Sequence, residues 1–125
     1  MHVLRNMVEA VEKGGLVLDL QVIRPNPRVE VDGHVVCQID GEPLFRLADA
    51  AAAAVDSFIA GGELIEEAVD DHDVLKHYAN GADLIDDFAD KERRIADEAI
   101  PRVRRVTGPC VTRERCRLRR LVRSP

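Results

Sequence analysis

Arginine side chains recur at every second position near the C-terminus, at residues 113, 115, 117 and 119. Alternate residues of an extended strand point to the same face, so this spacing predicts a row of guanidinium groups that could bind phosphates. Residues 101–125 contain no aromatic side chain on which a base could stack. We therefore expect the arginines to pair with carboxylates of the same chain, and we do not expect nucleic acid as a partner.

The segment around two histidines has side chains that could ligate a metal, but not in a recognisable order. His72 and His77 lie among three aspartates, Asp70, Asp71 and Asp73. Imidazole and carboxylate groups both bind metals, yet this spacing matches no familiar ligand pattern. We interpret the segment as a solvated acidic stretch and assign no metal ligand.

The three cysteines do not form a catalytic or disulfide pattern. Cys37, Cys110 and Cys116 show no CxxC spacing, which is typical of reduced structural thiols in a cytoplasmic protein. No serine or cysteine stands in a nucleophile motif, so we assign no catalytic residue. No apolar run approaches the roughly 18 residues that span a bilayer, and we expect no membrane association.

The candidate site residues follow an apolar stretch at residues 16–23. Arg24, Asn26 and Arg28 come directly after this stretch, within a proline-containing turn. In open α/β sheets, ligands bind beyond the carboxyl ends of the strands. We therefore predict a substrate-side rim at these three residues. The alternative is that the Pro-Asn-Pro segment only turns the chain.

The elements that would position this rim can be predicted from residue spacing. Five apolar residues fall at helical spacing before Gly14, which predicts a helix that this glycine ends: Val3, Leu4, Met7, Val8 and Val11. Residues 16–23 are apolar except for Asp19 and Gln21, which is typical of a strand covered on both faces of a parallel sheet. Two prolines, at 25 and 27, end that strand because each lacks a backbone donor.

Further along the chain, the clearest signal is Asp32-Gly33, which predicts a hairpin over residues 28–39 with Val35, Cys37 and Ile39 on one face. Residues 44–60 form an alanine-rich helical pattern. Residues 63–79 fit either an amphipathic helix or a strand, and we choose the strand. We also expect a helix capped by Asn80, a helix over 94–105 that Pro101 kinks or breaks, and a basic strand over 110–122.

This order resembles the C-terminal half of class I S-adenosylmethionine-dependent methyltransferases. The likeness begins at Val11-Glu12-Lys13-Gly14-Gly15, where that family often has Leu-x-Pro-Gly-Gly between its fourth helix and fifth strand. Lys13 stands where the family often has proline. The resemblance implies that residues 16–23 are strand five, 66–78 strand six, and 110–122 strand seven, inserted antiparallel between the other two. It thus implies an α/β fold, a partial Rossmann-like sheet with a hairpin insertion and flanking helices, over one segment, residues 1–125.

The resemblance does not extend to the family's cofactor site. The family binds its cofactor with a glycine-rich loop after the first strand, but this chain has no GxGxG. Its Gly-Gly pairs, at 14–15 and 61–62, follow helical patterns instead of opening helices. We therefore assign no cofactor-binding residue and expect S-adenosylmethionine to bind only if a missing half is supplied. The chain would be a truncated or split methyltransferase, not catalytic alone.

Acidic and basic residues are unevenly distributed along the chain, and this distribution helps to predict which segments pair with each other. Residues 1–100 hold 22 acidic and 9 basic residues, whereas residues 101–125 hold one acidic and nine basic residues. An acidic strand six beside a basic strand seven would account for this split. Strand 16–23 would lack the neighbour that the family's fourth strand supplies, so we expect a homo-oligomer or a partner chain that pairs with it. The alternative function is a small acidic α+β interaction or regulatory module without enzymatic activity.

Overall fold

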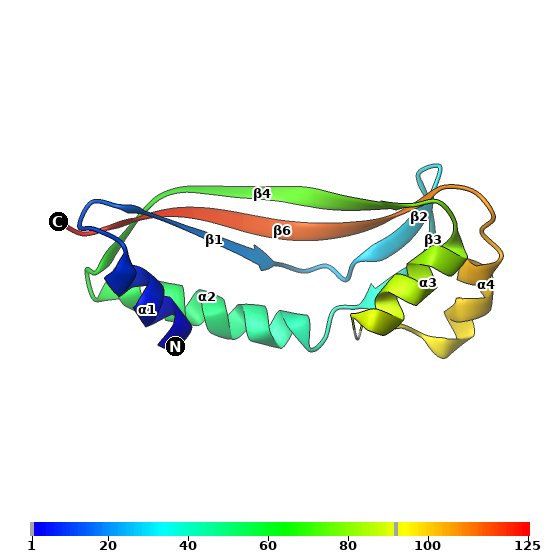
Figure 1. The fold of residues 1–125 in the computed structure, drawn as a ribbon, viewed down its shortest axis with the longest axis horizontal. Coiled ribbons are helices and arrows are strands. Elements are labelled where there is room, and N and C mark those ends of the chain that lie inside the picture. The colour runs from blue at the N-terminus through cyan, green and yellow to red at the C-terminus, as the bar shows by residue number, and fades with distance from the viewer. Residues whose placement is uncertain (1, 92) are drawn as a thin grey trace. The chain divides into compact units, whose positions relative to one another are not determined.

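The computed structural model describes residues 2–91 and 93–125, which form a mixed α/β fold with an antiparallel sheet of six strands and four α-helices (Figure 1). The chain divides into two compact units. Unit 1 contains the described residues up to Ile23, together with Pro43–His72 and Cys116–Pro125. Unit 2 contains the described residues of Arg24–Glu42 and Asp73–Arg115. None of the described helices is both long and apolar enough to cross a membrane.

Two helices of unit 1 cover one face of its strands. Helix α1 (His2–Ala10) ends four residues before Gly14, which instead lies in a turn with a φ of 80°. Helix α2 (Leu44–Ala60) follows Pro43 and has the predicted bounds. Six buried side chains from these helices and from three strands form the apolar cluster of unit 1: Val8, Val17, Val55, Phe58, Leu64 and Leu121.

The strand predicted at 16–23 forms, but its predicted environment is wrong. Strand β1 (Leu16–Val22) pairs antiparallel with β6 (Cys110–Arg123), with Leu16 opposite Val122 and Val22 opposite Cys116. Only one face of β1 is covered, because α1 and α2 pack on the side of Val17. A continuous apolar run therefore marked a strand with one exposed apolar face, not a strand buried in a parallel sheet.

Residues 63–79, which fit either a helix or a strand, form mainly a strand, as predicted. Strand β4 (Leu64–Tyr78) pairs with β6. Within unit 1 the two strands run antiparallel, since Glu67 bonds to Arg120 whereas Asp71, later in β4, bonds to Arg117, earlier in β6. The helical spacing of apolar residues was misleading because most β4 side chains are exposed, so burial imposes little alternation on them.

In unit 2 the predicted hairpin is present, with one error in its faces. Strands β2 (Arg28–Val31) and β3 (His34–Asp40) flank Asp32 and Gly33, whose φ angles are 50° and 79°. The register shifts between Val29 and Glu30, so that Val29 lies opposite Cys37 but Glu30 opposite Val35. Val35 is consequently 57% exposed, although its predicted face contains buried Cys37 and Ile39. A β-bulge of this kind moves side chains to the other face.

The helical part of unit 2 differs from the prediction after residue 93. Helix α3 (Gly81–Asp90) begins as expected, with Asn80 Oδ1 accepting a hydrogen bond from the Asp83 backbone N–H at 2.9 Å. The helix predicted over 94–105 is replaced by strand β5 (Arg94–Ile95), a 3₁₀ turn η1 (Asp97–Ala99) and helix α4 (Ile100–Arg104). Pro101 lies at the start of α4, a position where its missing N–H costs nothing, so it begins a helix instead of kinking one.

The second apolar cluster lies wholly within unit 2. It joins the hairpin to α3, α4 and the first residue of β6 through eight buried side chains: Val29, Cys37, Ile39, Leu84, Phe88, Ala99, Val103 and Cys110. Within the unit, β2 pairs antiparallel with β6, and β3 with β5.

Candidate functional site

The candidate site of unit 1 is a groove of about 300 Å³ between α1, β1 and α2. Its walls are almost entirely apolar, from Val3 and Met7 on α1 to Leu47 and three alanines on α2. The alanines make the groove open, because small side chains on α2 leave space above β1. Three of the larger lining side chains remain exposed: Val3, Met7 and Leu47.

One carboxylate lies in this apolar groove. Asp19 shares the helix-covered face of β1 with Val17 and Gln21, and its Oδ1 accepts a hydrogen bond from Gln21 Nε2 at 3.0 Å. Its Oδ2 is buried and has no hydrogen-bond partner among the described residues. Arg119 lies opposite Asp19 in the register but bonds to Asp56 and Glu66 instead. A buried acceptor without a donor is costly, so the groove is suited to an apolar group that carries a hydrogen-bond donor.

The strand beneath the groove is also the edge of the sheet. β1 pairs with β6 on one side, and no described strand pairs with its other side. On the face away from the helices, Leu16, Leu18 and Leu20 are 45%, 54% and 56% exposed. Two β4 residues of unit 1, Ile65 and Val69, are exposed to a similar degree. The open edge and the apolar face of β1 are both features of a surface that pairs with another chain.

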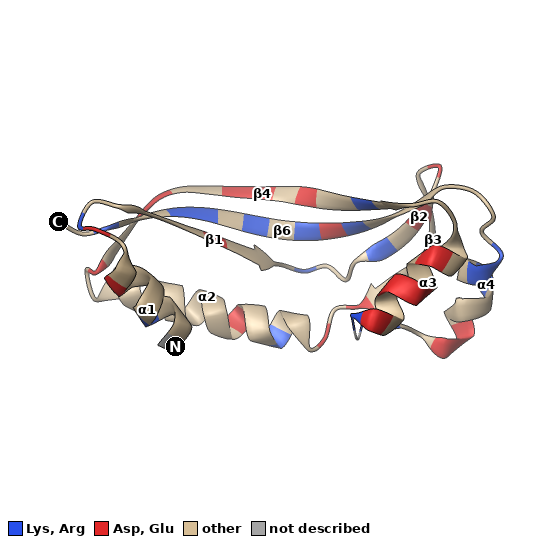
Figure 2. Ribbon diagram, in the orientation of Figure 1, with Lys and Arg blue, Asp and Glu red and all other residues tan. Residues whose placement is uncertain are grey.

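Three arginines of β6 in unit 1, Arg117, Arg119 and Arg120, pair with acidic residues, as predicted. Arg117 binds Asp71 through Nε and Nη2, at 2.8 and 2.9 Å, and Arg120 Nε donates to Glu67 at 3.0 Å. Figure 2 shows that acidic residues gather on β4 and basic residues on β6. The bidentate pairing with Asp71 raises the pKa of Arg117. The arginine row is thus an internal ion-pair ladder.

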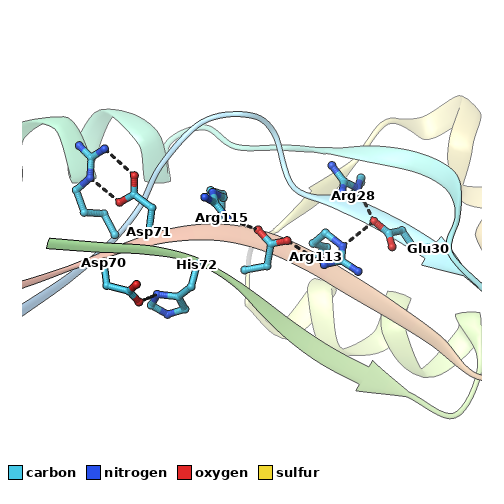
Figure 3. A network of polar contacts seen from close by, with 9 residues as sticks. Arg28, Glu30, Asp70, Asp71, His72, Arg113 and Arg115 are labelled. Atoms are coloured by element: carbon cyan, nitrogen blue, oxygen red, sulfur yellow. Dashed lines mark hydrogen bonds and ion pairs between the residues drawn. The ribbon is translucent and has the colours of Figure 1, made fainter.

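A denser network lies in unit 2 around Glu30, a buried carboxylate. Arg113 Nε donates to Glu30 Oε2 at 2.9 Å, and Arg28 Nε donates to the same oxygen (Figure 3). Arg113 also donates to Asp73, which accepts from Arg115 as well. These hydrogen bonds, the one from Arg113 above all, lower the pKa of Glu30 below its usual value. Here too the arginines are engaged by the protein itself.

No protein-family model, curated protein or solved structure matches this chain.

The structure places the predicted rim residues in separate environments. Asn26 lines a hollow of about 440 Å³ with Asp40 and Arg94, and its Oδ1 accepts a hydrogen bond from the Gly41 N–H at 3.2 Å. Arg28 belongs to the Glu30 network, and Arg24 is exposed in the turn. Neither arginine lines the hollow. The substrate-side rim therefore stays a prediction, with Asn26 its one member at a concave surface.

The remaining chemically active side chains do not gather into a site. The three cysteines are buried, and burial raises the pKa of the Cys37 and Cys110 thiols, which opposes a nucleophilic role. His72 Nδ1 lies 3.0 Å from Asp70 Oδ2. Among residues 2–91 and 93–125, no three His, Cys, Asp or Glu side chains lie close enough together to hold a metal.

Charge reversal of Arg117 provides a test of the ladder. We expect Arg117→Glu to lower the melting temperature, because it replaces a bidentate ion pair with Asp71 by repulsion. Arg94→Glu changes the net charge equally at an exposed position of β5 and should shift the melting temperature less. Calorimetry at low and high salt measures both. Equal shifts for the two variants would contradict a specific role for the ladder.

Proposed function

We propose that this chain is a methyltransferase-like segment that does not catalyse alone and is completed by a partner that pairs with β1. The observation that carries the proposal is the order β1–β6–β4, in which the last strand lies between the other two and runs antiparallel to β1. In class I methyltransferases the seventh strand occupies that place between strands five and six.

The order of elements along the chain supports the same assignment. The hairpin β2–β3 and helix α2 separate β1 from β4, as an insertion and a helix separate strands five and six in the family. Short helices then precede the last strand. An amphipathic helix at residues 63–79 would favour the rival proposal, a small interaction module, whereas a strand beside 110–122 favours the present one, and β4 spans most of that segment.

The open edge and the exposed apolar face of β1 support the proposal of a partner. No described strand pairs with its outer edge, and its exposed face carries three leucines. In the adjacent groove, one carboxylate oxygen has no hydrogen-bond partner among the described residues. A partner strand would satisfy the edge, and its neighbouring side chains would fill the groove. S-adenosylmethionine would then bind to the assembled protein, because the glycine-rich half of the site has to come from the partner.

Two measurements on the purified chain test the proposal. Isothermal titration with S-adenosylmethionine should give no binding, whereas light scattering across a concentration series should show association at micromolar concentrations. Micromolar binding of the cofactor to the chain alone would contradict the need for a second half. A stable monomer that binds little hydrophobic dye would contradict the need for a partner on β1.

A surface variant locates the association on β1. We expect Leu18→Lys combined with Leu20→Lys to reduce both self-association and binding of a hydrophobic dye, because charges on this exposed face oppose pairing. Val35→Lys is the control, since Val35 is similarly exposed but belongs to the hairpin of unit 2. If Val35→Lys weakened association as much as the β1 variant, the contact would not be specific to β1.

A further inference from the structure

We propose that unit 2 contains a binding site for a small oxyanion, a carboxylate or phosphate group, in the cavity between β4, α3 and β6. The cavity has a volume of about 220 Å³. Since a water molecule takes up roughly 30 Å³ of liquid, there is room for such a group with a short body. The described residues that line the cavity all belong to unit 2, and the site does not depend on the partner proposed above.

The two carboxylates that line the cavity, Asp87 and Glu114, already accept hydrogen bonds from protein donors. Asp87 Oδ2 accepts hydrogen bonds from Tyr78 Oη at 2.5 Å, from Lys76 Nζ at 2.9 Å and from Lys91 Nζ at 3.2 Å. Three donors on one oxygen leave little capacity for a ligand to donate to this carboxylate. Glu114, on the β6 side, accepts from Arg93 Nη2 at 2.7 Å.

The donors of the cavity are in excess. Each lysine ammonium carries three N–H groups, so Lys76 and Lys91 retain donors after binding Asp87, and both side chains are about half exposed. Arg93 Nε is buried and has no hydrogen-bond partner among the described residues. Among the described residues that line the cavity, three cations thus accompany two carboxylates. A ligand that supplies negatively charged acceptors would bind the remaining lysine N–H groups and balance the charge of the described lining residues.

The protonation states support an anionic ligand over the neutral pH range. Burial, together with the hydrogen bond to Asp87, raises the pKa of Tyr78 to about 12, so the phenol remains a donor. The hydrogen bonds from Tyr78 and Lys76 lower the pKa of Asp87, which therefore stays ionised. Tyr78 therefore stays neutral and Asp87 stays charged across the neutral pH range. Binding should change little between pH 6 and pH 8 unless the ligand itself titrates.

Titration of the full chain with inorganic phosphate, and separately with succinate, tests the site. We expect saturable binding of at least one of these anions, with amide NMR shifts at Lys76, Lys91 and Arg93. Lys76→Met should weaken binding at least roughly tenfold, as expected for the loss of a charge-assisted hydrogen bond. If that variant fails to fold, Lys91→Met is the equivalent test, because Tyr78 and Lys76 would still hold Asp87.

Lys13→Met is the matched control, because Lys13 is an exposed lysine in the turn of unit 1. It should leave binding unchanged. A preference for phosphate or for succinate identifies the chemical class of the ligand, and either preference supports the site. Absence of saturable binding for both anions would overturn the proposal, as would equal weakening by Lys13→Met and Lys76→Met.

Discussion

Replacement of Gly81 by alanine should unfold unit 2 at denaturant concentrations that leave the native chain folded. A Cβ at this position would lie 1.7 Å from the carbonyl oxygen of Val103 and 2.7 Å from its carbon. Gly81 is buried, and its N–H donates to the Val106 oxygen at 2.9 Å, so α3 cannot withdraw without breaking that bond. Because the clash is with backbone, we expect a loss of about 3 kcal/mol or more.

Gly108→Ala is the control for this substitution. Apart from the two neighbouring residues of the chain, no described residue has a heavy atom within 4 Å of the position that its Cβ would take. We expect a change in stability within about 0.5 kcal/mol, the usual range for surface positions. Tyr78, the only tyrosine of the chain, belongs to unit 2, so its fluorescence during urea unfolding reports on the affected unit directly. Equal stability of the two variants would contradict the close approach of α3 and α4.

Loss of the buried charge at Glu30 should have the second-largest effect. Glu30 is 5% exposed and accepts hydrogen bonds from Arg28 and Arg113. Glu30→Gln keeps the size of the side chain but presents a neutral amide to two guanidinium groups. We expect a loss of roughly 2 kcal/mol, typical of hydrogen bonds to a charged group. Glu67→Gln removes the charge from an exposed pair with Arg120 and should cost no more than about 0.5 kcal/mol.

The stabilisation of the fold by the Glu30 carboxylate should decrease as the pH falls. Arg113 and Arg28 hold its folded pKa below the value of 4.5 that is usual for glutamate. The stabilisation is therefore fully present above the unfolded pKa and is lost as the pH falls through the folded pKa. Urea unfolding at several pH values should show the native chain and Glu30→Gln converging in stability under acid conditions. A difference that stayed constant down to pH 2 would contradict the lowered pKa.

Short sequence signals predicted the elements whose formation depends on residues close by in the sequence, such as the hairpin and the start of α3. Asp32-Gly33 predicted the hairpin because both residues adopt positive φ, and Asn80 predicted the start of α3 because its side chain caps the helix. The extra residue of the bulge was not predictable, since it depends on how β2 meets β6. The one-sided burial of β1 was not predictable either, because it depends on α2, which is distant in sequence, as well as on α1.

The candidate site was visible in the sequence only as an irregularity. Asp19 and Gln21 interrupt an otherwise apolar strand, which by itself indicates no role for either residue. The groove around them requires α1, β1 and α2 to meet, and periodicity does not specify which helices share a face. By contrast, the ion-pair ladder followed from composition, because an acidic strand and a basic strand stabilise each other when adjacent.

The pairing of β1 with β6 has a consequence for how the protein is made. Leu16 pairs with Val122, and the Gly14 N–H donates to the Arg123 oxygen at 2.8 Å. A ribosome adds roughly 5–20 residues each second, so β1 waits several seconds after synthesis for the strand that completes its cluster. Val17, which packs with Leu121 of β6 in that cluster, is exposed during that interval, and such distant contacts also form slowly. Unit 1 should therefore be the part of the nascent chain that depends most on chaperones.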